Sequence, residues 1–327
     1  MQRHRLPPLL SRGSSVPETR PAPTAAKTAP TANKGNPIVK KKLLATLAVV
    51  PLVALLAGCS GAAADDAVKI GVVGASDPYW AEYTDAAAEA GITVDIIDFA
   101  VFEQPNPALS AGELDLNQFQ HIVYLGEYNV ASKQDLTPIG ATAIYPLGLY
   151  STEYGDVSEI KKGDVVSVPN DASNLARALL VLQSAKLITL SDGGSIYSTL
   201  DDIDTANSTV TVTALEASLT ATSLPDVAAA IINNDFVEKA GLKFEDALAQ
   251  DDPTDPNALP YVNVFAARAE DKDNATYKKL VEIYQTTKDV QDGVLAVSGG
   301  SAVLVQTPVA DLEASLATVE KDTKAKK

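Results

Sequence analysis

Arg177 is the residue best placed to bind a small anion. It closes the run Pro169-Asn170-Asp171-Ala172-Ser173-Asn174-Leu175-Ala176-Arg177, which follows a predicted strand and opens a predicted helix. Unpaired backbone N–H groups and the positive end of the helix dipole favour an anion at such a start. An arginine one turn further on can hold a carboxylate with two parallel hydrogen bonds. Two alternatives stay open: the polar residues only cap the helix, and Arg177 forms a surface ion pair.

Asn233 is a second candidate for the same kind of ligand. It follows the apolar, strand-like run Ala228–Ile232, and α/β folds bind ligands at the carboxyl ends of their strands. Its amide can accept a hydrogen bond from an ammonium group and donate one to a carboxylate. From the residues alone, an ordinary turn asparagine beside Asn234 is equally compatible. Asn174 is a similar but weaker candidate.

The sequence offers little material for catalysis or for a metal centre. Beyond residue 58 it has a single histidine, His121, and a single cysteine, Cys59, so a zinc site built from several such side chains is nearly excluded. We find no calcium-loop, nucleophile-elbow or P-loop lysine motif. His121 could serve as a base, but no motif places a nucleophile beside it. These features favour a binding protein without a cofactor over an enzyme.

Cys59 carries a different chemistry. It ends the run Leu56-Ala57-Gly58-Cys59, which follows the apolar stretch Leu43–Leu56 and the basic cluster Lys40-Lys41-Lys42. This order is typical of a lipoprotein signal peptide, in which small residues precede a cysteine whose thiol is acylated. The apolar stretch is too short to span a bilayer of about 30 Å. We therefore expect a lipid-anchored protein on the extracytoplasmic face of the cell membrane, with a buried structural cysteine as the alternative.

The residues before the lysine cluster do not fit a signal peptide. Residues 1–38 are rich in Pro, Ala, Thr and Arg and lack apolar periodicity. Val39 stands directly before the lysines, and a GTG-type valine codon can initiate translation. We interpret 1–38 as a mis-called or disordered extension, 39–58 as the signal peptide and 59–67 as a lipid-attached tether.

The predicted mature part, from Cys59 onward, is strongly acidic. The whole chain has a formal net charge of −16, and residues 1–58 contain nine lysines and arginines but one acidic residue, which leaves −24 for the remainder. Such a charge repels nucleic acid and anionic lipid. We therefore expect no nucleic-acid partner and a membrane attachment through the lipid anchor only.

Strand-like and helical segments alternate along the rest of the chain. The predicted strands are 68–74, 92–99, 114–116, 164–168, 209–215 and 261–267, and the predicted helices are 78–90, 108–112, 119–131, 175–184 and 277–288. We interpret 223–231 as a helix followed by a strand, and 294–305 is ambiguous. This alternation predicts an α/β fold with mainly parallel sheets.

Six short motifs occur in an order that resembles the methionine-binding lipoprotein family, the substrate receptors of methionine ABC importers. They are Phe119-Gln120-His121, Ile144-Tyr145-Pro146-Leu147-Gly148-Leu149-Tyr150-Ser151, Pro169 to Leu179, Leu215-Glu216-Ala217, Ile232-Asn233 before Ala240-Gly241-Leu242, and Tyr261-x-Asn263-Val264. The resemblance covers about 68–285, in addition to the lipoprotein signal. It implies a two-lobed periplasmic-binding-protein-like fold with a hinge of two crossover strands, near 145–151 and 261–265. Lobe 1 would comprise 68–146 plus 264–327, and lobe 2 would comprise 147–263.

The resemblance also implies roles for particular side chains. Arg177 would hold an amino-acid carboxylate and Asn233 would bind the same headgroup. An apolar wall around the ligand side chain would comprise Phe102, Phe119, His121 and Tyr124, of which the last three are expected on neighbouring helical turns. A polarizable sulfur packs well against aromatic rings. Ordinary core aromatics are the alternative.

The sequence departs from the family pattern around this wall. Phe102 stands where the family usually has Tyr, Gln118 where it has an aromatic residue, and Val123 where it has Pro, while Ala100-Val101 replaces a segment with an acidic residue. The headgroup site is thus better supported than methionine itself. We expect a receptor that delivers methionine, or a closely related apolar amino acid, to the permease and ATPase subunits of an ABC importer. A receptor for another amino-acid derivative or dipeptide, an exported hydrolase and a surface adhesin are the alternatives.

Overall fold

The computed structural model describes residues 67–255 and 257–326, which all belong to one compact unit, Ser60–Lys327. The predicted extension 1–38, the signal peptide 39–58, the acylated Cys59 and the tether up to residue 66 lie outside the described residues. Within the described part, every helix is too short or too polar to cross a membrane.

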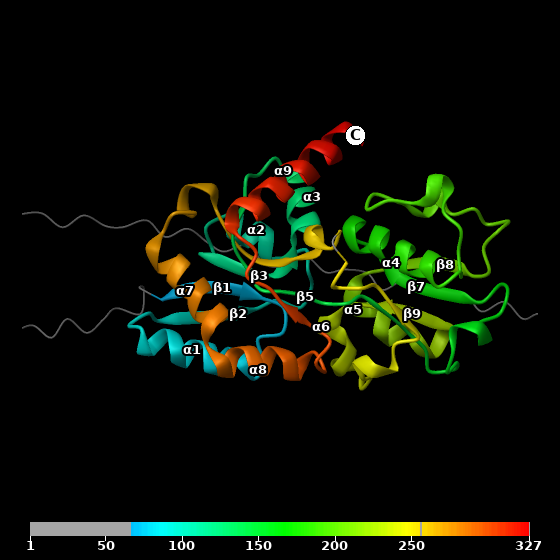
Figure 1. Cartoon of the computed structure of the whole chain (residues 1–327), viewed down its shortest axis with the longest axis horizontal. Helices are drawn as coiled ribbons and strands as arrows, with labels where there is room; N and C mark the ends of the chain where they lie inside the picture. Colours follow the sequence, from blue (N-terminus) through cyan, green and yellow to red (C-terminus); the bar gives the residue numbers. More distant parts are fainter. Residues whose placement is uncertain (1–66, 256, 327) are drawn as a thin grey trace, which may run out of the picture. The chain divides into compact units, whose positions relative to one another are not determined.

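The first lobe is built on a five-stranded sheet with the strand order β2-β1-β3-β11-β4 (Figure 1). The strands are β1 (Val68–Val72), β2 (Val94–Asp98), β3 (Leu116–His121), β4 (Thr137–Ala141) and β11 (Asn263–Ala267). β1 runs parallel to β2 and β3, whereas β11 runs antiparallel to β3 and β4. β3, β4 and β11 are buried along their whole length, as expected for central strands covered on both faces.

The second lobe has its own five-stranded sheet, in the order β10-β6-β9-β7-β8. Its strands are β6 (Gly148–Tyr150), β7 (Val165–Pro169), β8 (Thr211–Leu215), β9 (Ala229–Ile232) and β10 (Ala249–Gln250). β7 is parallel to β8 and β9, while β6 is antiparallel to β9 and β10. A two-stranded ribbon of β5 (Ala143–Ile144) and β12 (Val303–Leu304) completes the strands described here.

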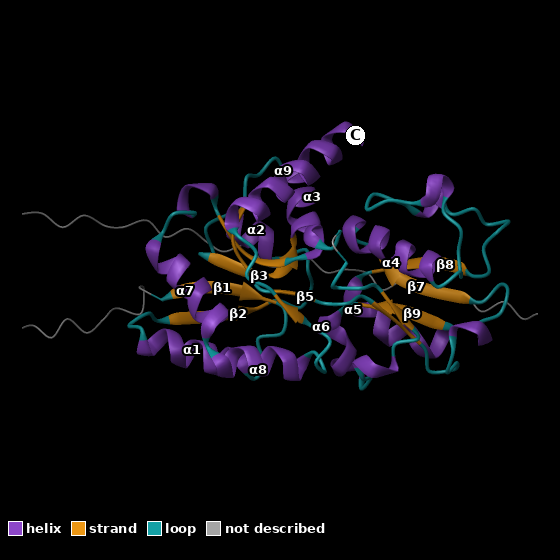
Figure 2. Ribbon diagram, viewed as in Figure 1, coloured by secondary structure: helices purple, strands orange, loops and turns teal. Residues whose placement is uncertain are grey.

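Helices cover both faces of each sheet (Figure 2). They are α1 (Tyr79–Glu89), α2 (Pro105–Ser110), α3 (Ile122–Ser132), α4 (Ala172–Ser184), α5 (Ala217–Thr220), α6 (Asn234–Val237), α7 (Ala275–Thr286), α8 (Lys288–Val297) and α9 (Val309–Lys326). Short 3-10 helices occupy Val157–Glu159, Ser191–Gly193, Leu200–Asp202, Ala221–Asp226, Glu238–Ala240, Phe244–Asp246, Leu259–Tyr261 and Ala269–Asp271. Local chemistry sets several starts: α4 begins after Asp171 and α7 after Asn274, and both side chains accept hydrogen bonds from the first-turn backbone.

Separate apolar clusters fill the space between sheets and helices. α1, α7 and α8 pack on one face of the first sheet, where the rings of Tyr83, Phe265 and Tyr284 meet, and α2, α3 and α9 pack on the other face. α4 covers one face of the second sheet. A further cluster joins the lobes, because Phe102 and Phe119 from the first contact Phe236 and its neighbours from the second.

The chain passes between the two sheets twice. It leaves the first sheet after β4, runs through β5 and 145–147 and enters β6. It returns from β10 through 251–262 to β11. This arrangement confirms the predicted two-lobed α/β fold with two crossings. We propose the lobe boundaries given above, at 146/147 and 263/264, as the division that accompanies it.

The structure corrects two sequence-based expectations. The helix predicted over 119–131 begins only at Ile122, because Phe119–His121 form the end of β3 and pair with β11. The sheets are mixed rather than mainly parallel, because the crossing strands β6 and β11 run antiparallel to their neighbours. The ambiguous 294–305 segment contains the end of α8 and the whole of β12.

Candidate functional site

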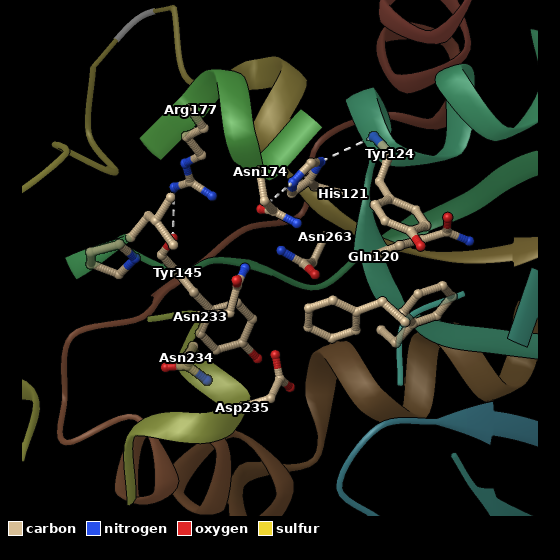
Figure 3. A pocket seen from close by; sticks show the side chains of 14 residues that line it. Gln120, His121, Tyr124, Tyr145, Asn174, Arg177, Asn233, Asn234, Asp235 and Asn263 are labelled. Atoms are coloured by element: carbon tan, nitrogen blue, oxygen red, sulfur yellow. Dashed lines mark hydrogen bonds between the residues drawn. The ribbon is translucent and has the colours of Figure 1, made fainter. Parts of the chain in front are cut away.

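A narrow pocket is lined by residues of both lobes (Figure 3). Its volume is about 420 Å³ when its opening is included. All seven side chains singled out for the ligand from the sequence line this pocket: Phe102, Phe119, His121, Tyr124, Asn174, Arg177 and Asn233. Nowhere in the described part do three or more His, Cys, Asp or Glu side chains gather so as to hold a metal ion.

Arg177 extends from α4 toward the pocket, and 6% of its side-chain surface is exposed. Its Nε donates to Asp251 Oδ2 at 2.5 Å, and its Nη2 donates to the backbone oxygen of Tyr145 at 2.8 Å. The guanidinium also lies over the ring of Tyr261, 4.3 Å from the ring centre. Among residues 67–255 and 257–326, no group accepts a hydrogen bond from Nη1. The ion pair is thus mostly buried, and one edge of the fork remains available to a carboxylate.

Asp251 was not identified as a site residue from the sequence. Its Oδ1 accepts from the backbone N–H of Leu147 at 2.8 Å, while its Oδ2 accepts from Arg177. One carboxylate therefore connects the outgoing crossing, the returning crossing and α4. In the sequence, Asp251 begins an Asp- and Pro-rich stretch typical of a turn, which gave no sign of a partner 74 residues away.

His121 and Asn174 form a hydrogen bond between the lobes. His121 ends β3 and caps α3, so its Nδ1 accepts from the backbone N–H of Tyr124 at 3.2 Å. Its Nε2 therefore carries the proton and donates to Asn174 Oδ1 at 3.3 Å. Burial, reinforced by the nearby charge of Arg177 and opposed by the bond to Asn174, lowers the pKa of His121 to about 3. His121 is neutral, and its partners are an amide and a backbone N–H rather than a hydroxyl or thiol.

The first turn of α4 fixes Asn174. Asp171 is the N-cap, and its Oδ1 accepts from the backbone N–H of Asn174 at 2.9 Å and from Asn174 Nδ2 at 3.0 Å. With its Oδ1 bound to His121, the Asn174 amide has a partner at each end. The polar residues of this run do cap the helix, as one alternative stated, and Asn174 in addition positions His121.

Asn233 and Asn234 bring unpaired acceptors to the pocket. Asn233 occupies the N-cap position of α6 but makes no capping hydrogen bond with its side chain. The Oδ1 atoms of both residues are buried, and no described residue is hydrogen-bonded to either of them. Leaving a buried acceptor unsatisfied costs roughly 1–3 kcal/mol. Two unpaired oxygens on residues that line one pocket suit a ligand that donates hydrogen bonds, such as an ammonium group.

The opposite wall of the pocket is aromatic. The ring centres of Phe102 and Phe119 lie 6.0 Å apart, and Tyr124 meets Phe119 edge-on at 5.7 Å. Phe119 and Tyr124 reach the pocket from a strand and a helix respectively, rather than from neighbouring turns of one helix. Phe102 and Phe119 also belong to the apolar cluster between the lobes, so these rings line the pocket and pack the core at once.

Seven further lining residues were not identified from the sequence as ligand-binding. They are Gln120, Tyr145, Pro146, Leu147, Asn234, Asp235 and Asn263. Most of them stand inside the motifs quoted above, so proximity to a recognised motif was an available signal. Asp235 had no such signal beyond its place two residues after Asn233.

Two α/β lobes, two crossings and a pocket lined from both lobes define a two-lobed substrate-binding protein with a periplasmic-binding-protein-like fold. The sequence profile of the NlpA lipoprotein family matches residues 68–303. The chain therefore belongs to the NlpA lipoprotein family.

Individual relatives agree with this assignment. The chain is 34% identical over 272 residues to a probable D-methionine-binding lipoprotein MetQ of Pasteurella multocida, an alignment that covers 79% of this chain and 97% of the relative. The substrate-binding protein of a methionine transporter from Streptococcus pneumoniae superposes with a TM-score of 0.68 at 33% identity, covering 73% and 95% of the two chains. A nutrient-binding protein of Burkholderia cenocepacia, solved with methionine bound, superposes with a TM-score of 0.67 at 35% identity. That alignment covers 72% of this chain and 99% of the other.

Proposed function

We propose that this protein is a lipid-anchored extracytoplasmic receptor that binds methionine, or a closely related apolar amino acid, and delivers it to an ABC importer. The observation that carries the proposal is the buried Arg177, whose Nη1 finds no acceptor among the described residues, while unpaired amide oxygens and an aromatic wall line the same pocket. The methionine-binding and methionine-transporter descriptions of the relatives support the ligand and the importer.

In this proposal each part of the ligand has its own partners. The carboxylate binds Nη1 and Nη2 of Arg177, the ammonium group donates to Asn233, and the thioether side chain packs against the rings of Phe102, Phe119 and Tyr124. Asn174 and His121 position the wall and join the lobes. Because such a ligand contacts both lobes, its binding favours the closed arrangement.

Methionine is expected to bind at least ten times more tightly than glutamate or lysine, a difference of about 1.4 kcal/mol. A charged side chain would lose water beside the rings of Phe102, Phe119 and Tyr124, which carry no opposite charge to replace that water. The measurement is calorimetric titration of the soluble part after unfolding and refolding, which removes co-purified ligand, with both methionine enantiomers as separate titrants. A sugar, glutamate or lysine that bound more tightly than methionine would show that the ligand assignment is wrong.

Cys59 is expected to be acylated and to form the N-terminus of the mature protein. The expectation comes from the signal described above, and the names of relatives as lipoproteins support it. Mass spectrometry of the membrane fraction should find lipid on Cys59, and Cys59→Ser should release the protein or leave it unprocessed. An unmodified Cys59 behind an intact 1–58 segment would contradict the lipid anchor.

A further inference from the structure

Asp235 is the single carboxylate among the described residues that line the pocket. It lies in the first turn of α6, directly after the two asparagines with unpaired oxygens. Figure 3 shows Asn233, Asn234 and Asp235 along one side of the pocket, with Arg177 at another side. The pocket therefore contains one positive group, which Asp251 partly neutralises, and one negative group.

No ion pair within the described part of the chain involves Asp235. Lys239, one turn further along, is the nearest candidate, but it is exposed and its ammonium lies 5.6 Å from the centre of the Phe236 ring. The carboxylate of Asp235 is supported by its own backbone N–H. Enclosing a carboxylate without a cationic partner is unfavourable, so packing alone does not explain this residue.

Burial raises the pKa of Asp235 to about 6, with Asp77 adding to the rise and Lys239 opposing it. Other titratable groups face this region from the packed elements: Tyr79 of α1, Tyr145 of the outgoing crossing and Tyr284 of α7. Burial keeps the pKa of each tyrosine well above its usual range, so none of them titrates near neutral pH.

We propose that Asp235 is the specificity-determining residue for the ligand's α-ammonium group, which it binds together with the unpaired oxygens of Asn233 and Asn234. An ammonium group has three N–H donors, and all three acceptor residues line the pocket. The inference rests on the proposed function, because it assumes an amino-acid headgroup held by Arg177. It adds that the pocket rejects analogues in which the amine is replaced by an uncharged group.

The first test compares methionine with its 2-hydroxy analogue, in which a hydroxyl replaces the ammonium group. Wild-type protein should prefer methionine, and Asp235→Asn should reduce that preference roughly tenfold or more, because a hydrogen bond to a charged acceptor is about twice as strong as a neutral one. The hydroxy analogue itself should bind both proteins with similar affinity. Leucine and its 2-hydroxy analogue form a second matched pair.

The matched control is Asp77→Asn, which removes the same charge near Lys239 from a residue that does not line the pocket. It should leave the preference for the amine unchanged. Lys239→Gln provides an independent test, because it removes the charge that lowers the pKa of Asp235 and should therefore raise that pKa.

The second readout is the pH profile of methionine affinity. Only ionised Asp235 pairs with ammonium, so affinity should be constant from about pH 7 up to the pH at which the ligand's own amine loses its proton. It should fall by up to tenfold per unit below about pH 6. Asp235→Asn should flatten this profile, and Lys239→Gln should shift its midpoint to higher pH. His121 remains neutral across this range. Asp171, whose pKa burial also raises, is unchanged in both variants and cannot produce the difference.

Three outcomes would overturn the inference. If Asp235→Asn keeps the full preference for the amine and the same pH profile, Asp235 does not bind the ammonium group, while the proposed function stands. If lysine binds the wild type as tightly as methionine and loses this affinity in Asp235→Asn, the carboxylate serves a ligand side chain instead. If no amine-bearing ligand binds the refolded wild type, the proposed function and the inference both fail.

Discussion

Replacing Arg177 with alanine is expected to weaken methionine binding roughly 30-fold to several-thousand-fold, a loss of about 2–5 kcal/mol. The guanidinium is buried and is the only cationic group that lines the pocket among the described residues. Its removal leaves the ligand's carboxylate in the pocket without a cation, and it also removes the partner of Asp251. Titration calorimetry on refolded protein measures the loss.

Arg268 provides a matched control for this substitution. It is also largely buried, donates to the backbone oxygens of Leu109 and Leu114 and pairs with Asp271, yet it does not line the pocket. Arg268→Ala is expected to lower the thermal stability while methionine affinity in the folded protein changes little. An Arg177→Ala protein that melts cooperatively and binds methionine with unchanged affinity would rule out the carboxylate role.

Replacing Phe265 with alanine is expected to reduce the free energy of unfolding by about 3–5 kcal/mol. This corresponds to a midpoint of thermal unfolding that is roughly 6–20 °C lower. Phe265 is fully buried in β11, a central strand of the first sheet. Its ring stacks on Tyr83 with a 6.2 Å separation and meets Tyr284 edge-on at 5.3 Å. The substitution therefore leaves a cavity beside the rings of Tyr83 and Tyr284.

Thermal and urea denaturation measure this effect. Phe244→Ala truncates a partly exposed phenylalanine in the second lobe. It should reduce the free energy of unfolding clearly less than Phe265→Ala does. Methionine affinity at low temperature should change little in Phe265→Ala, since Phe265 does not line the pocket. A loss below 1 kcal/mol would mean that the neighbouring rings repack into the space.

Local patterns made much of this fold predictable. The alternation of apolar runs and helical spacing indicated β1, α1, β7 and α4, whose observed bounds agree with the expected segments within a few residues. The start of α4 was predictable because the N-cap residue Asp171 and the backbone N–H group that it binds are close in sequence. Most of the seven candidate residues could be selected because they stand in short motifs, and the structure brings all seven to one pocket.

Long-range pairing accounts for what could not be predicted. Phe119–His121 have an ambiguous local pattern, and only their pairing with β11, more than a hundred residues later, makes them a strand. Asp251 and Asp235 look like ordinary loop or helix-start acids in the sequence. Their importance depends on which groups surround them after folding. Asp251 meets Arg177 and Leu147, whereas Asp235 lines the pocket and forms no ion pair with any described residue.

The position of Asp251 has a mechanical consequence. Its carboxylate links Leu147 in the outgoing crossing to Arg177 on α4, and Arg177 in turn donates to Tyr145 in that same crossing. Any change in the angle between the lobes bends both crossings, so it also moves the guanidinium. The affinity of Arg177 for a ligand carboxylate therefore depends on the angle between the lobes. In the proposed receptor, a partner that separates the lobes would weaken the binding of the ligand's carboxylate to Arg177 in the same movement. The ligand would then stay bound until the receptor meets that partner and would be released there.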